Sequence, residues 1–252
     1  MSTQRYVSPE LTHFVGKGRA EDEQYAMLVK DILKTGWLKH DPTNPTPKEI
    51  LKSGTLVSGS RPRDDTEAWD AQVVCFCDIP VTDLEIHMKK YSRFGLSFIK
   101  RFLVDKGANP MLYVANNSPA LPFGLPGAES QKGPWPRREV FEGNVQLYRD
   151  FHYEKFGEFP ATLDFFLTNL VFSFIKYFDH STSDDEAANV YMEREWRVLG
   201  DVNFALTNVH RVFLPQRYAE RFRADLPNYA GQLTFFPDVG EHGGVLQSST
   251  AC

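Results

Sequence analysis

The chain has 252 residues, and its 28 Lys and Arg against 33 Asp and Glu give a net charge of −5. With no basic block, a protein that coats duplex nucleic acid by charge alone is not expected, although a local groove for one strand stays open. Apolar residues at 42% suffice for a packed core in one large domain. The longest apolar run, Leu163 to Phe178, is too short to span a membrane, and three cysteines are too few for a disulfide scaffold. We therefore expect a cytoplasmic protein with no membrane partner.

The first half of the chain alternates short strands and helices. Residues 41–65 contain four prolines and are expected to form a loop-rich insertion. Apolar runs and alternation predict the strands, and helical spacing with end signals predicts the helices. The strands are expected at 11–15, 73–77, 94–99 and 111–115, and the helices at 22–33, 82–91 and 100–106.

The second half contains longer helical blocks. Helices are expected at 145–156, at 163–178 (buried) and at 215–225, and strands at 192–199, 209–214 and 233–236. The irregular mixture predicts an α+β fold with a mixed, mostly antiparallel sheet. We expect a single domain over residues 1–240, with insertions at about 41–65 and 116–190, and a mobile tail at 241–252.

Common catalytic and metal motifs are absent from the sequence. Cys75 and Cys77 alternate on one strand but lack the C-x-x-C spacing of zinc sites, so we interpret them as small buried residues and predict no metal. The H-E-x-x-H, G-x-x-x-x-G-K-[ST], G-x-G-x-x-G and G-x-S-x-G patterns do not occur. Metalloprotease, P-loop and α/β-hydrolase activities are therefore not expected.

The segment E-R-E-W-R gives the strongest candidate for chemistry. Strand alternation would place Glu193, Glu195 and Arg197 on one face, with Trp196 anchoring the other face in the core. Two close carboxylates raise one pKa, and the arginine keeps the other ionised, which suits a site that stabilises positive charge. The alternative is a structural ladder of ion pairs at an exposed edge.

Other candidates come from loops and helix faces. Thr12 and His13 end the first strand beside a glycine loop where a backbone approaches a ligand closely, although a histidine packed in the core is the alternative. Arg61 and Arg63 would suit an anion clamp or stay as solvated loop charges. Tyr91 shares a helix face with His87, either as a packed pair or as a ring that stacks on a ligand.

Several segments together resemble the AbiGi family of bacterial abortive-infection proteins. They span most of the chain, from L-T-H-F near its start through V-C-F-C-D-I-P, G-A-N-P-M-L-Y-V and E-R-E-W-R-V to F-L-P-Q-R-Y-A-E-R-F-R. The resemblance implies the antitoxin half of a two-gene phage-resistance system, whose toxin partner, AbiGii, is similar to nucleotidyltransferases.

A more distant resemblance is to ADP-ribosyltransferases of the DarT type, which share the strand ending in T-H, the P-M-L-Y run and a late glutamate. It implies an ADP-ribosyltransferase-like fold with NAD as substrate. Thr12 and His13 would then hold the NAD ribose, and Arg61 would face a phosphate or the ribosyl group, with Arg63 left open as its substitute. Glu195 would be the catalytic glutamate, and Glu193 the first acid of a Glu-x-Glu pair.

The residue types fit this chemistry, because a carboxylate beside the ribose stabilises the positive charge that develops when nicotinamide leaves. The first hypothesis is a phage-defence enzyme that transfers ADP-ribose to a protein or nucleic acid, or releases it. The alternative is a non-catalytic antitoxin that binds a toxin through the helix at 165–178 or the basic helix at 216–223, supported if either exposes an apolar face. The enzyme requires His13, an arginine and Glu195 to converge on one cleft.

Overall fold

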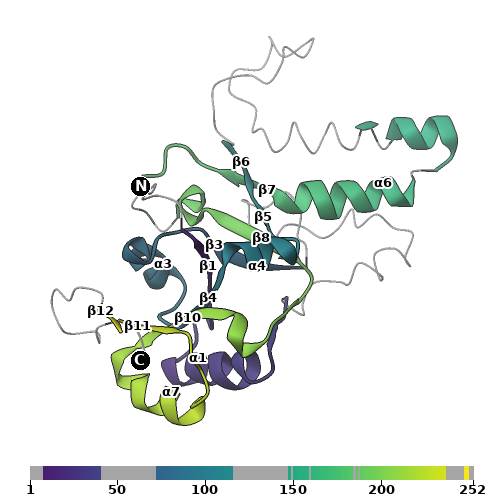
Figure 1. Ribbon diagram of the computed structural model, residues 1–252. Helices are drawn as coiled ribbons and strands as arrows, with labels where there is room; N and C mark the ends of the chain where they lie inside the picture. The colour runs from purple at the N-terminus through teal and green to yellow at the C-terminus, as the bar shows by residue number, and fades with distance from the viewer. Residues whose placement is uncertain are drawn as a thin grey trace, which may run out of the picture. The chain divides into compact units, whose positions relative to one another are not determined.

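The chain forms two compact units, each built from separated stretches of sequence (Figure 1). The computed structural model describes residues 8–40, 72–115, 147–148, 150–158, 160–183, 186, 188–236 and 247–249. The first unit comprises Met1–Asp41, Val73–Pro110 and Glu193–Cys252, and the second comprises Pro42–Gln72 and Met111–Met192. Nearly all of the two expected insertions belong to the second unit.

An eight-stranded sheet forms the first unit, in the order β12-β11-β10-β4-β1-β3-β8-β5. Among the strand pairs described in this sheet, only β10 with β11 is parallel, so the predicted α+β class with a mixed, mostly antiparallel sheet is confirmed. A separate antiparallel pair joins β2 (Trp37–Leu38) and β9 (Val202–Asn203). The strands of the large sheet are β1 (Glu10–Phe14), β3 (Val73–Cys77), β4 (Gly95–Ile99), β5 (Asn109–Pro110), β8 (Glu195–Leu199), β10 (Val209–Pro215), β11 (Gln232–Phe236) and β12 (Gln247–Ser249). Strand β12 lies within the segment expected to be a mobile tail.

One face of this sheet holds the main hydrophobic core. Because side chains alternate between the two faces along a strand, Leu11, Phe76, Phe98 and Val212 all point to that face. All four are buried there. The helices that contribute to this core are α1 (Glu21–Ala26) with its π-helical continuation η1 (Met27–Leu33), α4 (Lys100–Asp105), and α7 (Ala219–Asp225) after the turn η8 (Gln216–Tyr218). The helices expected at 22–33, 100–106 and 215–225 are thus confirmed.

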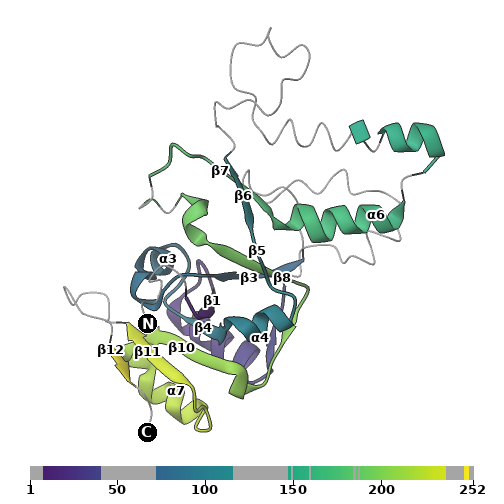
Figure 2. The same ribbon diagram turned by 45° about the horizontal axis from the view of Figure 1, so that its top comes forward.

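The opposite face of the sheet is covered differently. The turn η2 (Val81–Asp83) leads into α3 (Glu85–Lys90), which lies apart from α4 and α7 in both views (Figures 1 and 2). A small apolar cluster on this side contains Leu84, Cys77, Phe213 and Phe236, with Met88 of α3 packed against it. Most of the other side chains that the strands direct to this face are polar, and these polar side chains form the candidate site.

The second unit has a smaller core around Phe172, Ile175 and Tyr177. Helical residues 147–148 and 150–156 precede α6 (Ala161–Phe165), which continues as η4 (Phe166–Val171) and η5 (Phe172–Phe174). The chain then enters β7 (Ile175–Phe178), which pairs in parallel with β6 (Leu112–Ala115). The prediction of one buried helix over 163–178 is wrong, because the β-prone sequence Ile-Lys-Tyr-Phe pairs with β6 instead. The short turns η6 (Val190–Glu193) and η7 (Leu206–Asn208) complete the elements.

Candidate functional site: a buried polar face of the sheet

A row of polar side chains crosses five neighbouring strands. Backbone partners link Arg211 to Ser97, Ser97 to Thr12, Thr12 to Cys77, and Cys77 to Glu195. Residues directly opposite each other in antiparallel strands project to the same face, so these five side chains share one side of the sheet. Together with their strand neighbours Glu10, Arg197 and Thr234 they are called the polar face below. Apart from Arg211, all of these residues are classed as buried.

Glu10 is the centre of one half of the polar face. Its carboxylate accepts hydrogen bonds from Arg211 Nε, at 3.2 and 3.3 Å, and from the Ser97 hydroxyl. Arg211 also donates from Nη1 to Thr234 Oγ1 at 2.8 Å. The buried charge of Glu10, only 3% exposed, is therefore compensated by a cation and a hydroxyl.

Glu195 and Arg197 form the other half. Arg197 Nε donates to Glu195 Oε1 at 2.6 Å, with both residues on β8 and both buried. Their placement on one face agrees with the alternation expected from the sequence. The arginine that was expected to flank a reactive carboxylate instead binds it directly, as in a structural ion pair.

Glu193 lies outside strand β8, although the sequence predicted a strand over 192–199. Strand β8 begins at Glu195, and Arg194 before it has φ = 45°, the only positive value among non-glycine residues in the described ranges. This left-handed residue breaks the period-two pattern, so Glu193 belongs to the preceding turn η6. Its Oε1 accepts hydrogen bonds from Lys90 Nζ and the Tyr91 hydroxyl, both at 2.6 Å. The proposed Glu-x-Glu pair is thus divided between two different sets of partners.

Tyr91 is positioned by packing as well as by Glu193. Its ring lies parallel to that of Phe14, with centroids 6.4 Å apart, and Lys17 Nζ lies 4.9 Å from the ring centroid. His87 is buried beside the same two rings. The structure therefore brings Tyr91 and Glu193 together, but with the Tyr91 hydroxyl and ring already in contact with protein groups.

His13 lies on the other face of the sheet from Glu195. The ring of His13 packs 5.8 Å from that of Phe76, and Phe76 is the backbone partner of Trp196. His13 thus belongs with the core-facing residues, whereas its neighbour Thr12 shares the row of Glu195. His13 Nδ1 lies 2.8 Å from the carbonyl oxygen of Cys75. Burial lowers the pKa of His13 from its ordinary value of 6.5, opposed by this hydrogen bond. The expected convergence of His13 and Glu195 on one cleft is not found.

The other predicted site residues are distributed as follows. Thr12 is 1% exposed, and its Oγ1 has no hydrogen-bond partner within the described ranges. Arg61 and Arg63 lie outside the described residues. Both cysteines were predicted to be buried. Cys77 is buried, as predicted, whereas Cys75 is exposed. Burial raises the pKa of the Cys77 thiol, which keeps it protonated and unreactive.

Three charged residues of this site were not predicted from the sequence: Glu10, Arg211 and Lys90. Arg211 gave a usable signal, because a charged residue on the mostly apolar predicted strand 209–214 is expected to have a partner. Glu10 lies just before the predicted strand 11–15. Nothing local in the sequence indicated its contact with a residue 201 positions later.

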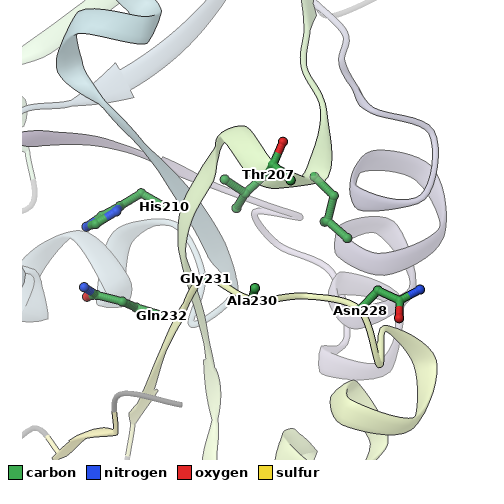
Figure 3. Close-up of a pocket in the computed structure, with 8 residues that line it drawn as sticks. Thr207, His210, Asn228, Ala230, Gly231 and Gln232 are labelled. Atoms are coloured by element: carbon green, nitrogen blue, oxygen red, sulfur yellow. The ribbon is translucent and has the colours of Figure 1, made fainter. Parts of the chain in front are cut away.

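A cavity of about 420 Å³ lies at the beginning of β10 and β11. Its lining includes Leu206, Thr207, His210, Asn228 and Gln232. Figure 3 shows His210 and Gln232 side by side on neighbouring strands, with Asn228 pointing the opposite way beyond Ala230 and Gly231. The polar groups therefore do not converge on one ligand atom, and the lining has no acid or lysine or arginine.

The basic helix expected to bind a partner is occupied within the first unit. Arg217 pairs with Glu21, and Arg221 Nη1 lies 3.0 Å from Asp22 Oδ1. The Tyr25 hydroxyl also donates to Asp225 at 2.7 Å, which holds α1 against α7. Arg217 and Arg221 of the basic helix are therefore already paired with acidic residues of α1.

The second unit, in contrast, exposes many large apolar side chains. Phe165, Phe166 and Leu170, on the helix that was expected to be buried, are 39–50% exposed. Helical residues 147–148 and 150–156 expose five more, at 48–68%: Leu147, Tyr148, Phe151, Tyr153 and Phe156. Contiguous exposed apolar surface is typical of protein interaction sites.

No group of three or more potential metal ligands lies among the described side chains. No helix in the same ranges has the length and apolar character needed to cross a membrane.

Comparison with protein families gives one match. A family model described as "Putative abortive phage resistance protein AbiGi, antitoxin" matches residues 67–225, which is more than half of the chain. Searches of curated proteins and of solved structures each gave no significant match. The distant resemblance to DarT-type enzymes therefore has no support from these comparisons, and the ADP-ribosyltransferase-like fold stays a prediction.

Proposed function

The chain belongs to the AbiGi family, and we propose that it serves abortive-infection phage defence as an antitoxin that binds its toxin through protein–protein contacts. The observation that carries this proposal is the apolar surface of the second unit. It exposes eight large side chains, on residues 147–156 and on Phe165, Phe166 and Leu170, all at 39% or more. Aromatic side chains are enriched in protein interfaces.

The carboxylates of the first unit support a scaffold role for its sheet. Glu10 is bound by Arg211 and Ser97, Glu195 by Arg197, and Glu193 by Lys90 and Tyr91. A catalytic carboxylate must contact the reacting atoms, and each of these three already has a charged donor from the protein. Such pairing favours a fixed native structure over turnover.

The alternative, transfer of ADP-ribose from NAD, has weaker support. It requires the imidazole of His13 and the carboxylate of Glu195 to face the same ribose. The strand register instead assigns His13 to the core side with Phe76, and Glu195 to the polar face with Thr12. We therefore prefer the partner-binding hypothesis over the enzymatic one.

Growth rescue in bacteria tests the proposal. The AbiGii-type toxin from the same genome is expressed alone, with this chain, or with this chain carrying Leu28→Ala, a core substitution expected to unfold part of the protein. We expect growth arrest by the toxin, rescue by the wild-type chain, and recovery of both proteins in one complex. Rescue without a complex would overturn direct binding, and failure of rescue would overturn the antitoxin role.

A further inference from the structure

The chain enters strand β8 through a backbone conformation that is unusual for the residue that adopts it. In the part of the chain that the structure describes, Arg194 is the only residue other than glycine with a positive φ, at 45°. In this left-handed region the Cβ atom crowds the following carbonyl oxygen. Such a conformation persists only where the surrounding contacts enforce it, so the contacts beside Arg194 explain how it is kept.

The residue before Arg194 is held by the end of α3. Oε1 of the buried Glu193 accepts hydrogen bonds from Lys90 Nζ and from the Tyr91 hydroxyl, both at 2.6 Å. The Tyr91 ring lies parallel to that of Phe14, which fixes the direction of its hydroxyl. Hydrogen bonds to an ionised acceptor are stronger than those between neutral groups. We call Glu193 with these two donors the clamp.

The carbonyl group of Arg194 is held from a different strand. Its oxygen accepts a hydrogen bond from the backbone N–H of Asp78, at 3.0 Å, directly after β3. The Asp78 carboxylate in turn accepts from Lys100 Nζ at 2.8 Å and from the backbone N–H of Ser8 at 3.1 Å. Arg194 is therefore fixed through its neighbour on one side and through its own carbonyl group on the other.

This strained residue lies where the chain returns from the second unit. The chain leaves the first unit after Pro110 and enters it again at Glu193. The two ends of this excursion are neighbours in the sheet, because Pro110 of β5 is the backbone partner of Trp196 of β8. Hinges are typically a few residues at the ends of elements that absorb a change in φ and ψ. Arg194, immediately before β8, has this position.

We propose that Glu193 and Arg194 form a clamped hinge at this return of the chain. In the closed state the clamp keeps Arg194 left-handed. In the open state Glu193 leaves its two donors, Arg194 relaxes to an ordinary backbone conformation, and the N–H of Asp78 loses its acceptor, while the strands of the sheet stay paired. The hinge is independent of the antitoxin function, so either proposal can fail alone.

Hydrogen exchange of the native full-length chain tests whether the opening is local. Hinge opening exposes little surface, so exchange at the Asp78 amide should change little with urea below the unfolding midpoint. Leu96, fully buried on β4, is the matched control, and its exchange should accelerate with urea because it requires global unfolding. An equally steep urea dependence at both amides would overturn the hinge.

Substitutions in the clamp test what keeps the hinge closed. Glu193→Ala should speed exchange at Asp78 about 10-fold or more, as for the loss of hydrogen bonds to a charged group. Tyr91→Phe removes one donor and should give a smaller increase, which is measurable even if Glu193→Ala fails to fold. Glu85→Ala breaks an exposed pair with Lys89 on the same helix and should change exchange by no more than about two-fold. Exchange as slow in Glu193→Ala and Tyr91→Phe as in this control would overturn the clamp.

Substitutions of Arg194 test the strain itself. Arg194→Gly and Arg194→Ala both remove the arginine side chain, but only alanine keeps the Cβ atom that disfavours a positive φ. We expect exchange at Asp78 to be about 3-fold or more slower in Arg194→Gly than in Arg194→Ala. Equal rates in the two variants would show that Arg194 is not strained and would overturn the hinge.

Discussion

Arg211 of β10 and Glu10 of β1 pair across an intervening strand. Strand β4 separates β10 from β1 in the sheet, and its Ser97 lies between the two charged residues and donates to Glu10. The contact joins two positions that are 201 residues apart in the sequence. Glu10 is buried and Arg211 is partly buried, so removal of the arginine has a large expected cost.

Arg211→Ala should lower the free energy of unfolding by about 3–5 kcal/mol, because it leaves the buried Glu10 charge without its cation. Chemical denaturation monitored by circular dichroism measures this difference. The double variant Glu10→Met/Arg211→Met should regain most of the loss, because it buries no charge at all. Lys89→Ala, which breaks an exposed pair with Glu85, is the control and should change stability by less than about 0.5 kcal/mol. Equal losses for Arg211→Ala and the double variant would contradict this account.

Glu195→Gln distinguishes a structural from a catalytic carboxylate. The amide keeps the size of the side chain but removes the charge bound by Arg197 Nε. We expect a loss of about 1.5–3 kcal/mol in unfolding free energy, typical of a hydrogen bond between charged groups. NAD consumption by purified wild type and variant should be equal and at background. A variant with full stability and a selective loss of NAD turnover would restore the enzymatic hypothesis.

His13 should make the protein less stable in mild acid. Its pKa is lowered in the folded state by burial, so below 6.5 the unfolded chain binds the proton more readily than the folded one. The stabilisation is therefore complete above pH 6.5 and is lost as the pH falls toward the lowered pKa. Chemical denaturation at pH 7.5 and pH 5.5 measures the effect, and His13→Gln, which does not titrate, should show a smaller difference between the two. An unchanged difference would assign the acid sensitivity to other groups.

The exposed apolar residues of the second unit should matter little for folding. Phe166→Ser and Leu170→Ser, at positions 49% and 50% exposed, should each change the unfolding free energy by less than about 0.5 kcal/mol. Leu28→Ala, at a position with no exposed surface, should cost about 2–5 kcal/mol in the same assay. Losses of several kcal/mol at Phe166 or Leu170 would show that these side chains belong to a core.

Local pattern in the sequence predicts the elements of the first unit well. Strands such as β3 and β10 and the helix from Glu21 to Leu33 follow from alternation, helical spacing and stop residues, which act over a few positions. The helix expected at 163–178 failed because its last four residues pair with β6, more than 60 positions earlier. Pairing over such a distance is not visible in a local window.

The candidate site was harder to predict for the same reason. Alternation correctly placed Glu195 and Arg197 on one face of β8. The strand does not extend to Glu193, because the left-handed residue Arg194 ends the period-two pattern. His13 and Glu195 were both on predicted strands, but their relation depends on the register of β1 with β3 and β8, which a single sequence does not reveal.

Direct titration of the full-length chain with the purified AbiGii-type toxin tests the central claim most directly. Isothermal titration calorimetry should show saturable binding, because an antitoxin that works by contact forms a complex with its toxin. Heats indistinguishable from dilution, in the presence of a toxin that this chain still neutralises in cells, would contradict an antitoxin that works by contact.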